Sequence, residues 1–126
     1  MLPLRGSGVH FLLTLNTCDC DAMYLIDADM MESKILKIVE ASKLTICKSL
    51  FYQFYMNKDK QAGYTGFVLL AESHVSLHAW PEYSKIDADI YVCNVSSNNE
   101  DKAQYIVDNI CKLFNPKEVD IKRIDR

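Results

Sequence analysis

The fold is decided by residues 74–93, HVSLHAWPEYSKIDADIYVC. Apolar and polar residues alternate on both sides of a break at Pro81, which is typical of two β-strands with one buried face each. The buried face is expected to carry Val75, Leu77, Ala79, Ile86, Ala88, Ile90 and Val92. The opposite face is expected to carry His74, Ser76, His78, Asp87, Asp89, Tyr91 and Cys93. We therefore predict strands at 74–79 and 86–93.

The rest of the chain predicts further elements on both sides of this pair of strands. Strands are expected at 9–16, 45–55, 64–71 and 119–124. A helix is expected over 25–42, where apolar residues follow helical spacing at Met31, Ile35, Ile38 and Val39. A second helix is expected to start at a capping box, Ser97 to Glu100, and to be stopped by Pro116.

This β-α-β-β-β-β-α-β order predicts an α+β fold, a two-layer sandwich in which two helices cover one face of a largely antiparallel sheet. Two helices do not easily cover both faces. The face that carries His74, His78, Asp89 and Cys93 is therefore expected to be wet or to be covered by something else, such as a second copy of the chain. A length of 126 residues fits a single domain, 1–126.

Composition excludes several classes of protein. Apolar residues make up 49% of the chain and charged residues 25%, as in ordinary soluble globular proteins. A net charge of −3 gives no basic footprint for nucleic acid, and no segment approaches the about 20 apolar residues that span a membrane. Five scattered cysteines favour reduced thiols in the cytoplasm over a disulfide framework. Cys18 and Cys20 do not have a usual zinc spacing, so no metal is expected.

The polar face of the two central strands offers acid–base chemistry. A neutral imidazole moves protons near pH 7, and a thiol serves as an acid or, once ionised, as a nucleophile. His78 and Cys93 therefore allow two interpretations: a thiol nucleophile with a histidine base, or acid and base groups that serve another reactive centre. Taken alone, each residue also fits a purely structural role. Nothing next to Cys93 indicates the oxyanion hole that a thiol protease needs.

The longer string AESHVSLHAWPEYSKIDADIYVC, residues 71–93, resembles the self-processing pyruvoyl decarboxylases of the S-adenosylmethionine decarboxylase family in its short prokaryotic form. The family signature runs close to E-S-H-x-x-x-H-x-W-P-E-Y and reaches a cysteine ten residues after the tyrosine, which is the interval from Tyr83 to Cys93. Weaker matches cover most of the chain: Gly8 with His10, Cys18 with Asp19, Phe51 with Phe54, and Gly63 with Thr65 and Gly66.

The resemblance implies that the chain cuts itself. The Ser73 hydroxyl would attack the carbonyl of Glu72, and β-elimination would then leave a pyruvoyl group in place of Ser73. His78 matches the processing base of the family, and Thr65 stands where the family has a supporting hydroxyl, usually serine. The products would be a β chain of residues 1–72 and an α chain of residues 73–126.

The resemblance also implies the second reaction, the decarboxylation of S-adenosylmethionine for spermidine biosynthesis. The pyruvoyl group, bound to substrate as a Schiff base, would replace pyridoxal phosphate as the electron sink, with no metal. Cys93 matches the proton donor. Phe54 matches an aromatic residue that stacks on adenine, Glu82 matches the motif glutamate that holds the ribose, and Trp80 is the motif tryptophan beside them. The family further implies a homodimer that pairs two open sheet faces as an αββα sandwich.

One local feature does not fit neatly. Ser73 and His78 are five residues apart, so a regular strand would point them to opposite faces. We expect a strained kink at the cleavage site to resolve this.

Several positions depart from the family pattern and keep other functions open. Ser84 to Asp87 replaces a Gly-Tyr-Ala-Ala-like stretch, Ala79 replaces a motif threonine, and the loop Met56 to Ala62 is longer than usual. Asp87 or Asp59 could pair the distal cation of a basic substrate, so an arginine or ornithine decarboxylase is the alternative. A processing-defective regulatory partner and, more distantly, a Cys/His zinc module are the alternatives from other classes.

Overall fold

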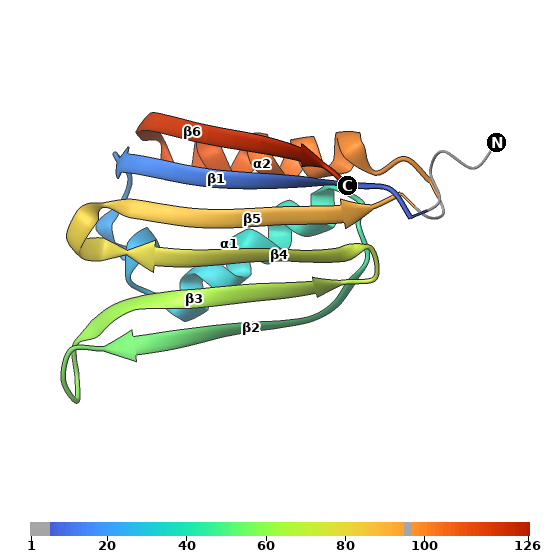
Figure 1. Cartoon of the computed structure of the whole chain (residues 1–126). Helices are drawn as coiled ribbons and strands as arrows, with labels where there is room; N and C mark the ends of the chain where they lie inside the picture. Colours follow the sequence, from blue (N-terminus) through green and yellow to red (C-terminus); the bar gives the residue numbers. More distant parts are fainter. Residues whose placement is uncertain (1–5, 95–96) are drawn as a thin grey trace.

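The computed structural model describes residues 6–94 and 97–126, which form one six-stranded sheet and two α-helices (Figure 1). The strands are β1 (Gly8–Cys18), β2 (Ile46–Tyr55), β3 (Gln61–Leu70), β4 (Ser73–Trp80), β5 (Lys85–Cys93) and β6 (Pro116–Asp125). The helices are α1 (Ala28–Ala41) and α2 (Glu100–Phe114), with short 3-10 turns η1 (Ala22–Leu25) and η2 (Pro81–Tyr83). The strand order is β2-β3-β4-β5-β1-β6, and every neighbouring pair is antiparallel.

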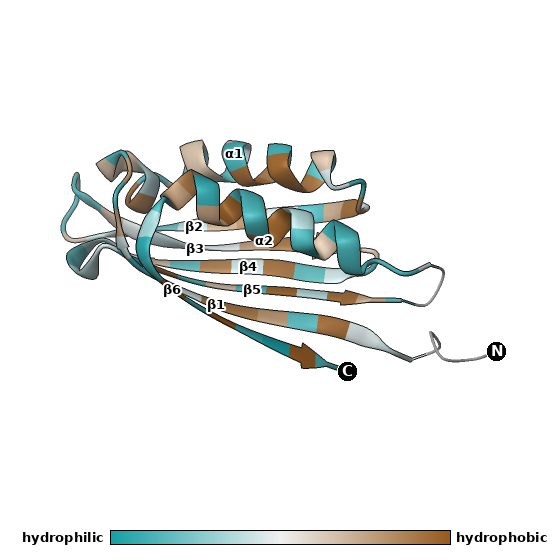
Figure 2. Cartoon of the chain, turned by 90° about the horizontal axis from the view of Figure 1, so that it is seen from above, coloured by the Kyte–Doolittle hydropathy of each residue, from teal (hydrophilic) through white to brown (hydrophobic). Residues whose placement is uncertain are grey.

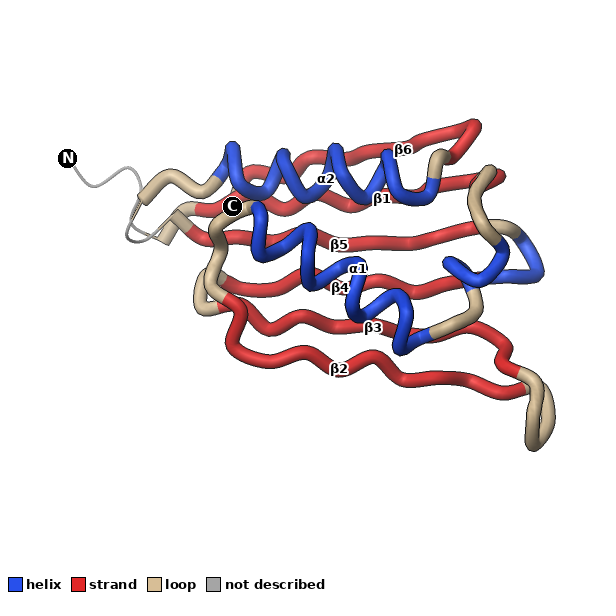
Figure 3. The backbone as a smooth tube through the Cα atoms, turned by 180° about the vertical axis from the view of Figure 1, so that it is seen from behind, coloured by secondary structure: helices blue, strands red, loops and turns tan. Residues whose placement is uncertain are grey.

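Both helices lie on one face of the sheet (Figure 2). Helix α1 packs against β2 and β3, and α2 packs against β1 and β5 (Figure 3). No described helix covers the other face, which we call the open face. The predicted two-layer α+β sandwich with a largely antiparallel sheet is therefore confirmed.

The core lies between the helices and the sheet. The apolar residues predicted to share one face of β4 and β5 are all buried, and their polar neighbours are not. They pack with apolar residues of the helices such as Met31, Ile35, Ile106 and Ile110, each of which has no exposed surface. A fully buried side chain of this size contributes about 1.5–3 kcal/mol to stability. A shift of β4 or β5 by one residue against its neighbouring strands would expose several such side chains and would be very costly.

The helix starts differ from the prediction. Helix α1 begins after Asp27, whose carboxylate accepts from the Met30 amide at 3.1 Å, and the residues from Ala22 form a separate turn. The capping box predicted at Ser97 is wrong. Helix α2 is preceded by Asn99, whose side chain makes no capping bond and instead donates to the carbonyl of Cys93 at 2.7 Å. Since that side chain ties the helix start to the end of β5, it does not serve as a cap.

The strand bounds are close to those predicted. Strand β3 starts three residues earlier than expected, at Gln61, which leaves a shorter loop of residues 56–60 that projects beyond the end of the sheet (Figure 1). Phe51 and Phe54 lie on opposite faces of β2: Phe51 is buried on the helix side, and Phe54 lies on the open face and is 40% exposed.

Gly66 is required by packing. It lies opposite Phe51 in the β2–β3 ladder, and the Phe51 ring covers it, so an added Cβ would approach three ring atoms to under 3.0 Å. Gly63 has a positive φ of 125°, which L side chains rarely adopt. Local structure therefore explains why glycine stands at both of these motif positions.

We expect Gly66→Ala to destabilise the fold by about 1–3 kcal/mol, because the new methyl group must displace the Phe51 ring. Urea denaturation of chains that also carry Ser73→Ala, so that all remain uncleaved, measures this. The cost should shrink in a Phe51→Leu background. An equal cost in both backgrounds would contradict this packing argument.

Candidate active site

The bond between Glu72 and Ser73 lies in a tight turn. Leu70, the last residue of β3, pairs directly with Ser73, the first residue of β4, so only Ala71 and Glu72 form the turn between them. Ser73 has a φ of 142°, a conformation that non-glycine residues adopt only under strain of about 1–3 kcal/mol. The backbone is therefore irregular at the predicted cleavage site.

The carbonyl of Glu72 is held by the end of β5. The backbone N–H of Cys93 donates to it at 2.8 Å, and the Cys93 carbonyl accepts from the Asn99 side chain. Asn99 is only 2% exposed, and its own N–H donates to Asn94 at 2.8 Å. This network fixes Cys93 on both sides. An N–H aimed at a carbonyl stabilises negative charge that develops on its oxygen.

A second group of predicted residues meets further along the sheet. Thr65 and His78 face each other across β3 and β4, with 2.7 Å between Oγ1 and Nδ1. The His78 ring lies 4.4 Å from the Trp80 ring and 6.0 Å from the Phe54 ring, measured between centroids. Thr65, His78, Trp80 and Phe54 thus form one cluster on the open face, which we call the histidine cluster.

The two groups do not meet within one chain. Five residues of continuous strand separate Ser73 from His78, which is about 16 Å at about 3.3 Å per residue. The β3–β4 turn and the end of β5 lie at one end of the sheet, and the end of β4 lies at the other (Figure 1). The kink expected at Ser73 is present, but it does not bring His78 to the cleavage site, because β4 keeps its register through His78.

Glu82 borders a separate cavity at the end of the sheet. This cavity of about 270 Å³ is lined by Glu82 and Pro81 of η2, by Ile26, and by Met56, Lys60, Gln61 and Ala62 from the β2–β3 hairpin. The hairpin that differs from the family pattern therefore lies beside the residue matched to ribose binding.

The open face also carries residues that the motif did not assign. His74 stacks on Phe67 at 5.2 Å and lies beside His10 and Tyr91, at centroid distances of 6.5 and 5.9 Å. Burial lowers the pKa of His74, and His10 lowers it further, whereas Asp89 opposes the shift. The neutral form of His74 is thus favoured one residue from Ser73. The sequence placed His74 in the motif and on the polar face of its strand but assigned it no role.

Three thiols away from the cleavage site, Cys18, Cys20 and Cys111, are fully or partly buried. Burial raises the pKa of Cys18 to about 11, with Cys20 adding to the shift, and burial also raises the pKa of Cys20 and Cys111. These thiols stay protonated and poorly nucleophilic near neutral pH. Cys93 is the cysteine that contacts the predicted cleavage site.

Comparisons with known proteins agree with the motif. Residues 11–126 match the family model of S-adenosylmethionine decarboxylase. An S-adenosylmethionine decarboxylase proenzyme of Picrophilus torridus is 33% identical over 94% of this chain and 83% of its own length. One from Aquifex aeolicus is 36% identical over 90% of this chain and 76% of its own. The crystal structure of the adenosylmethionine decarboxylase from Aquifex aeolicus superposes with a TM-score of 0.79, at 33% identity, over 94% of this chain and 89% of that one.

This chain belongs to the S-adenosylmethionine decarboxylase family. The resemblance inferred from residues 71–93 is therefore confirmed. The match includes both halves of the candidate site, the turn at Glu72 and the histidine cluster. Within the described part of the chain, none of the helices has the length and apolar character needed to cross a membrane.

Asp87, one of the departures from the family pattern, has a structural partner. Its carboxylate accepts from the Trp80 indole N–H at 3.0 Å and lies 3.6 Å from the Lys85 ammonium. Asp87 also pairs with His78 across β4 and β5. Asp87 thus holds the ring that packs on His78. Sequence reasoning missed this bond because the two residues are seven apart, on different strands.

We expect Asp87→Ala to release the Trp80 indole and to shift its fluorescence to longer wavelength, with a loss of about 0.5–1.5 kcal/mol in stability. Trp80 is the only tryptophan, so the emission reports this ring alone. Lys85→Ala is the matched control, since it removes the ion pair and keeps the acceptor. An unchanged spectrum in Asp87→Ala would show that the bond does not hold the ring.

Proposed function

We propose that this protein is a self-processing decarboxylase that converts S-adenosylmethionine to its decarboxylated form, the aminopropyl donor for spermidine synthesis. The observation that carries the proposal is the Glu72–Ser73 bond. It lies in a strained two-residue turn, and its carbonyl accepts a hydrogen bond from the Cys93 backbone. Family membership supports the same activity.

Self-cleavage needs no reagent other than water. The Ser73 Oγ adds to the Glu72 carbonyl carbon, the C–N bond breaks, and the hydroxyl proton ends on the Ser73 nitrogen, which gives an ester. A base then removes the Ser73 α proton, and the Cβ–O bond breaks, so that Glu72 leaves with a carboxylate terminus. Water releases ammonia from the remaining dehydroalanine and leaves a pyruvoyl group. The fragments are residues 1–72 and 73–126.

The residues at the turn fit a pyruvoyl group made in place. A serine follows a strained amide whose carbonyl oxygen already has a donor, which is the arrangement that the acyl shift requires. When formed, the pyruvoyl group supplies a carbonyl that withdraws electrons from the substrate and so allows carbon dioxide to leave. The N–H of Cys93 is bonded to the Glu72 carbonyl, and its carbonyl is bonded to the Asn99 side chain. Cys93 is thus held beside this position, where its thiol can return a proton to the substrate.

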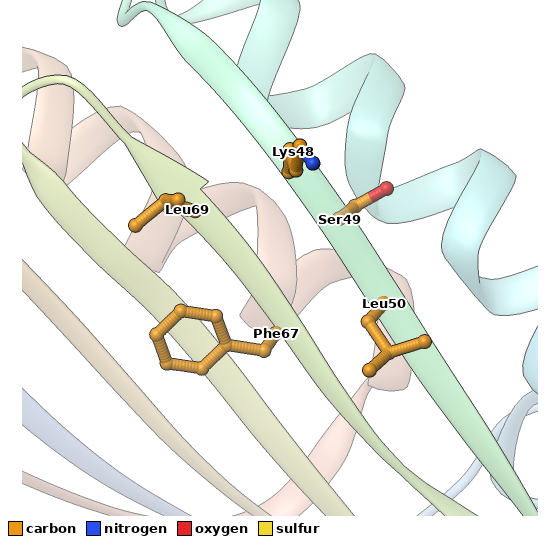
Figure 4. Close-up of a pocket in the computed structure, with 5 residues that line it drawn as sticks. All are labelled: Lys48, Ser49, Leu50, Phe67 and Leu69. Atoms are coloured by element: carbon orange, nitrogen blue, oxygen red, sulfur yellow. The ribbon is translucent and has the colours of Figure 1, made fainter.

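Pairing of two chains would complete the site. The distance of about 16 Å between Ser73 and His78 is too long for proton transfer within one chain. We infer a homodimer in which two open faces meet, so that the partner subunit's His78 reaches Ser73. The open face supports this pairing, since it exposes Leu50, Phe67 and Leu69 at a shallow cavity of about 210 Å³ (Figure 4). Tyr52, further along β2, is also exposed. Large apolar patches of this kind mark interaction surfaces.

The side chains around the histidine cluster support a nucleoside substrate. Phe54 and Trp80 of this cluster offer aromatic faces, and Glu82, in the separate cavity beside the β2–β3 hairpin, offers a carboxylate to hydroxyl groups. Asp87 is engaged by Trp80 and Lys85, so it is a poor partner for the distal cation of arginine or ornithine. The scattered cysteines support a reducing compartment, the cytoplasm.

We expect the purified wild-type chain to consist of fragments 1–72 and 73–126, the second blocked at its N-terminus by a pyruvoyl group. Ser73→Ala should remain one chain of 126 residues with no decarboxylase activity. Intact mass under denaturing, reducing conditions and release of carbon dioxide from S-adenosylmethionine, arginine and ornithine check both points. An uncleaved wild-type chain would instead favour the regulatory partner.

We expect Ser73→Ala and His78→Ala, each uncleaved alone, to complement each other when they are co-expressed with different tags. In a mixed pair the His78→Ala chain keeps Ser73 and meets an intact histidine, so only that chain should be cut. Mass analysis of pairs purified through both tags measures this. Mixed pairs that stay uncut would contradict a site shared between two chains.

A further inference from the structure

Thr45 directs all of its polar groups at the turn that precedes the cleavage site. Its backbone N–H donates to Glu72 Oε1 at 3.0 Å, and its hydroxyl donates to Glu72 Oε2 at 2.9 Å. Its carbonyl accepts from the Ala71 N–H at 2.9 Å. Both carboxylate oxygens of Glu72 and the backbone of the residue before it are therefore held by one threonine, 27 residues away in sequence.

Thr45 is itself held in place. It follows the end of α1 and precedes β2, and the connecting segment is folded back on the helix. The buried Ser42 hydroxyl donates to the Val39 carbonyl and accepts from the Leu44 N–H at 3.3 Å, and Leu44 is buried in the core. The threonine therefore presents its groups from a fixed position.

Glu72 is consequently fixed on two sides. Thr45 holds its side chain, and the Cys93 N–H holds its carbonyl oxygen. The strained φ of Ser73 comes directly after these anchors. Strain of this kind persists only where the surroundings hold the backbone, and otherwise the turn relaxes.

We propose that Thr45 is a positioning residue for self-cleavage, which holds Glu72 so that the Ser73 hydroxyl is kept near the carbonyl carbon that it attacks. This rests on the proposed function, since it concerns the same acyl shift. In that step the Glu72–Ser73 C–N bond breaks, an ester C–O bond forms, and the proton moves from oxygen to nitrogen. Rates of such shifts depend steeply on how the reacting atoms are held.

Thr45 and Glu72 both belong to the fragment 1–72, on the acyl side of the bond. The hydrogen bonds of Thr45 end on Glu72 and Ala71. They therefore act on the scissile bond and not on the groups proposed to carry out decarboxylation. Their loss should slow the appearance of fragments without changing turnover per processed chain.

The test compares Thr45→Val, which keeps the shape and removes the hydroxyl, with Thr45→Ser, which keeps the hydroxyl. Freshly translated chains are quenched at intervals, and the uncut fraction is read by mass. We expect Thr45→Val to slow cleavage about three- to tenfold, which corresponds to the loss of one ordinary hydrogen bond at an exposed site, and Thr45→Ser to stay within about twofold of wild type.

Two further measurements separate positioning from a general loss of structure. The double variant Ser73→Ala/Thr45→Val should unfold at most about 5 °C below Ser73→Ala alone, as expected for the loss of one hydrogen bond, and both chains stay uncleaved. The kcat of fully processed Thr45→Val, counted per cut chain, should match wild type. In a Glu72→Ala background, Thr45→Val should have no further effect on cleavage, because its partner is gone.

The outcomes distinguish this inference from the function on which it rests. A wild-type chain that is never cut between Glu72 and Ser73 overturns the proposed function. If Thr45→Val is cut as fast as the wild-type chain, only the role of Thr45 is overturned. Equal slowing by Thr45→Val with and without the Glu72 side chain also overturns it, since the effect would not pass through the carboxylate.

Discussion

The structure depends on the burial of only one face of the sheet. Helices α1 and α2 pack on that face, and the alternate apolar residues of β1, β4 and β5 are buried beneath them. This fixes the register of the central strands, because a slip of one residue would move each apolar side chain to the opposite face. The same constraint places His78, Cys93 and Thr65 on the open face, where a substrate or a second chain can reach them.

The turn at Glu72 combines strain with anchoring. The unfavourable φ of Ser73 costs about 1–3 kcal/mol, and each hydrogen bond to the turn returns about 0.5–1.5 kcal/mol. The bonds from Thr45 and from Cys93 together are of the same size as the strain. The turn can therefore remain folded in a conformation that a free peptide would leave. The proposed self-cleavage between Glu72 and Ser73 would benefit from strain held at this position.

The sequence predicted faces well, but it predicted distances and long-range bonds poorly. Alternation over residues 74–93 assigned the side chains of β4 and β5 to the correct faces, since one period of two residues governs both burial and direction. The alternation pattern predicts only the direction of the Ser73 and His78 side chains. The rise of about 3.3 Å per residue along the strand is what keeps the two residues apart. Thr45 resembles an ordinary strand residue, and its bond to Glu72 depends on how the end of α1 meets the β3–β4 turn. Polar side chains near helix ends have several partners within reach, and only the packed fold decides among them.

The open face is also divided in a way that bears on pairing. Most of its exposed large apolar residues lie on β2 and β3, with Ile124 on β6, whereas Asp87, Asp89 and Lys122 lie on β5 and β6. In a two-fold contact, if surface A of one chain meets surface B of its partner, then surface B of the first chain meets surface A of the partner. Each shared site therefore occurs twice. The turn at Glu72 and the histidine cluster lie at different points along the same strand. A two-fold axis between them would therefore bring each turn to the other chain's cluster, and both sites would be completed by the same contact.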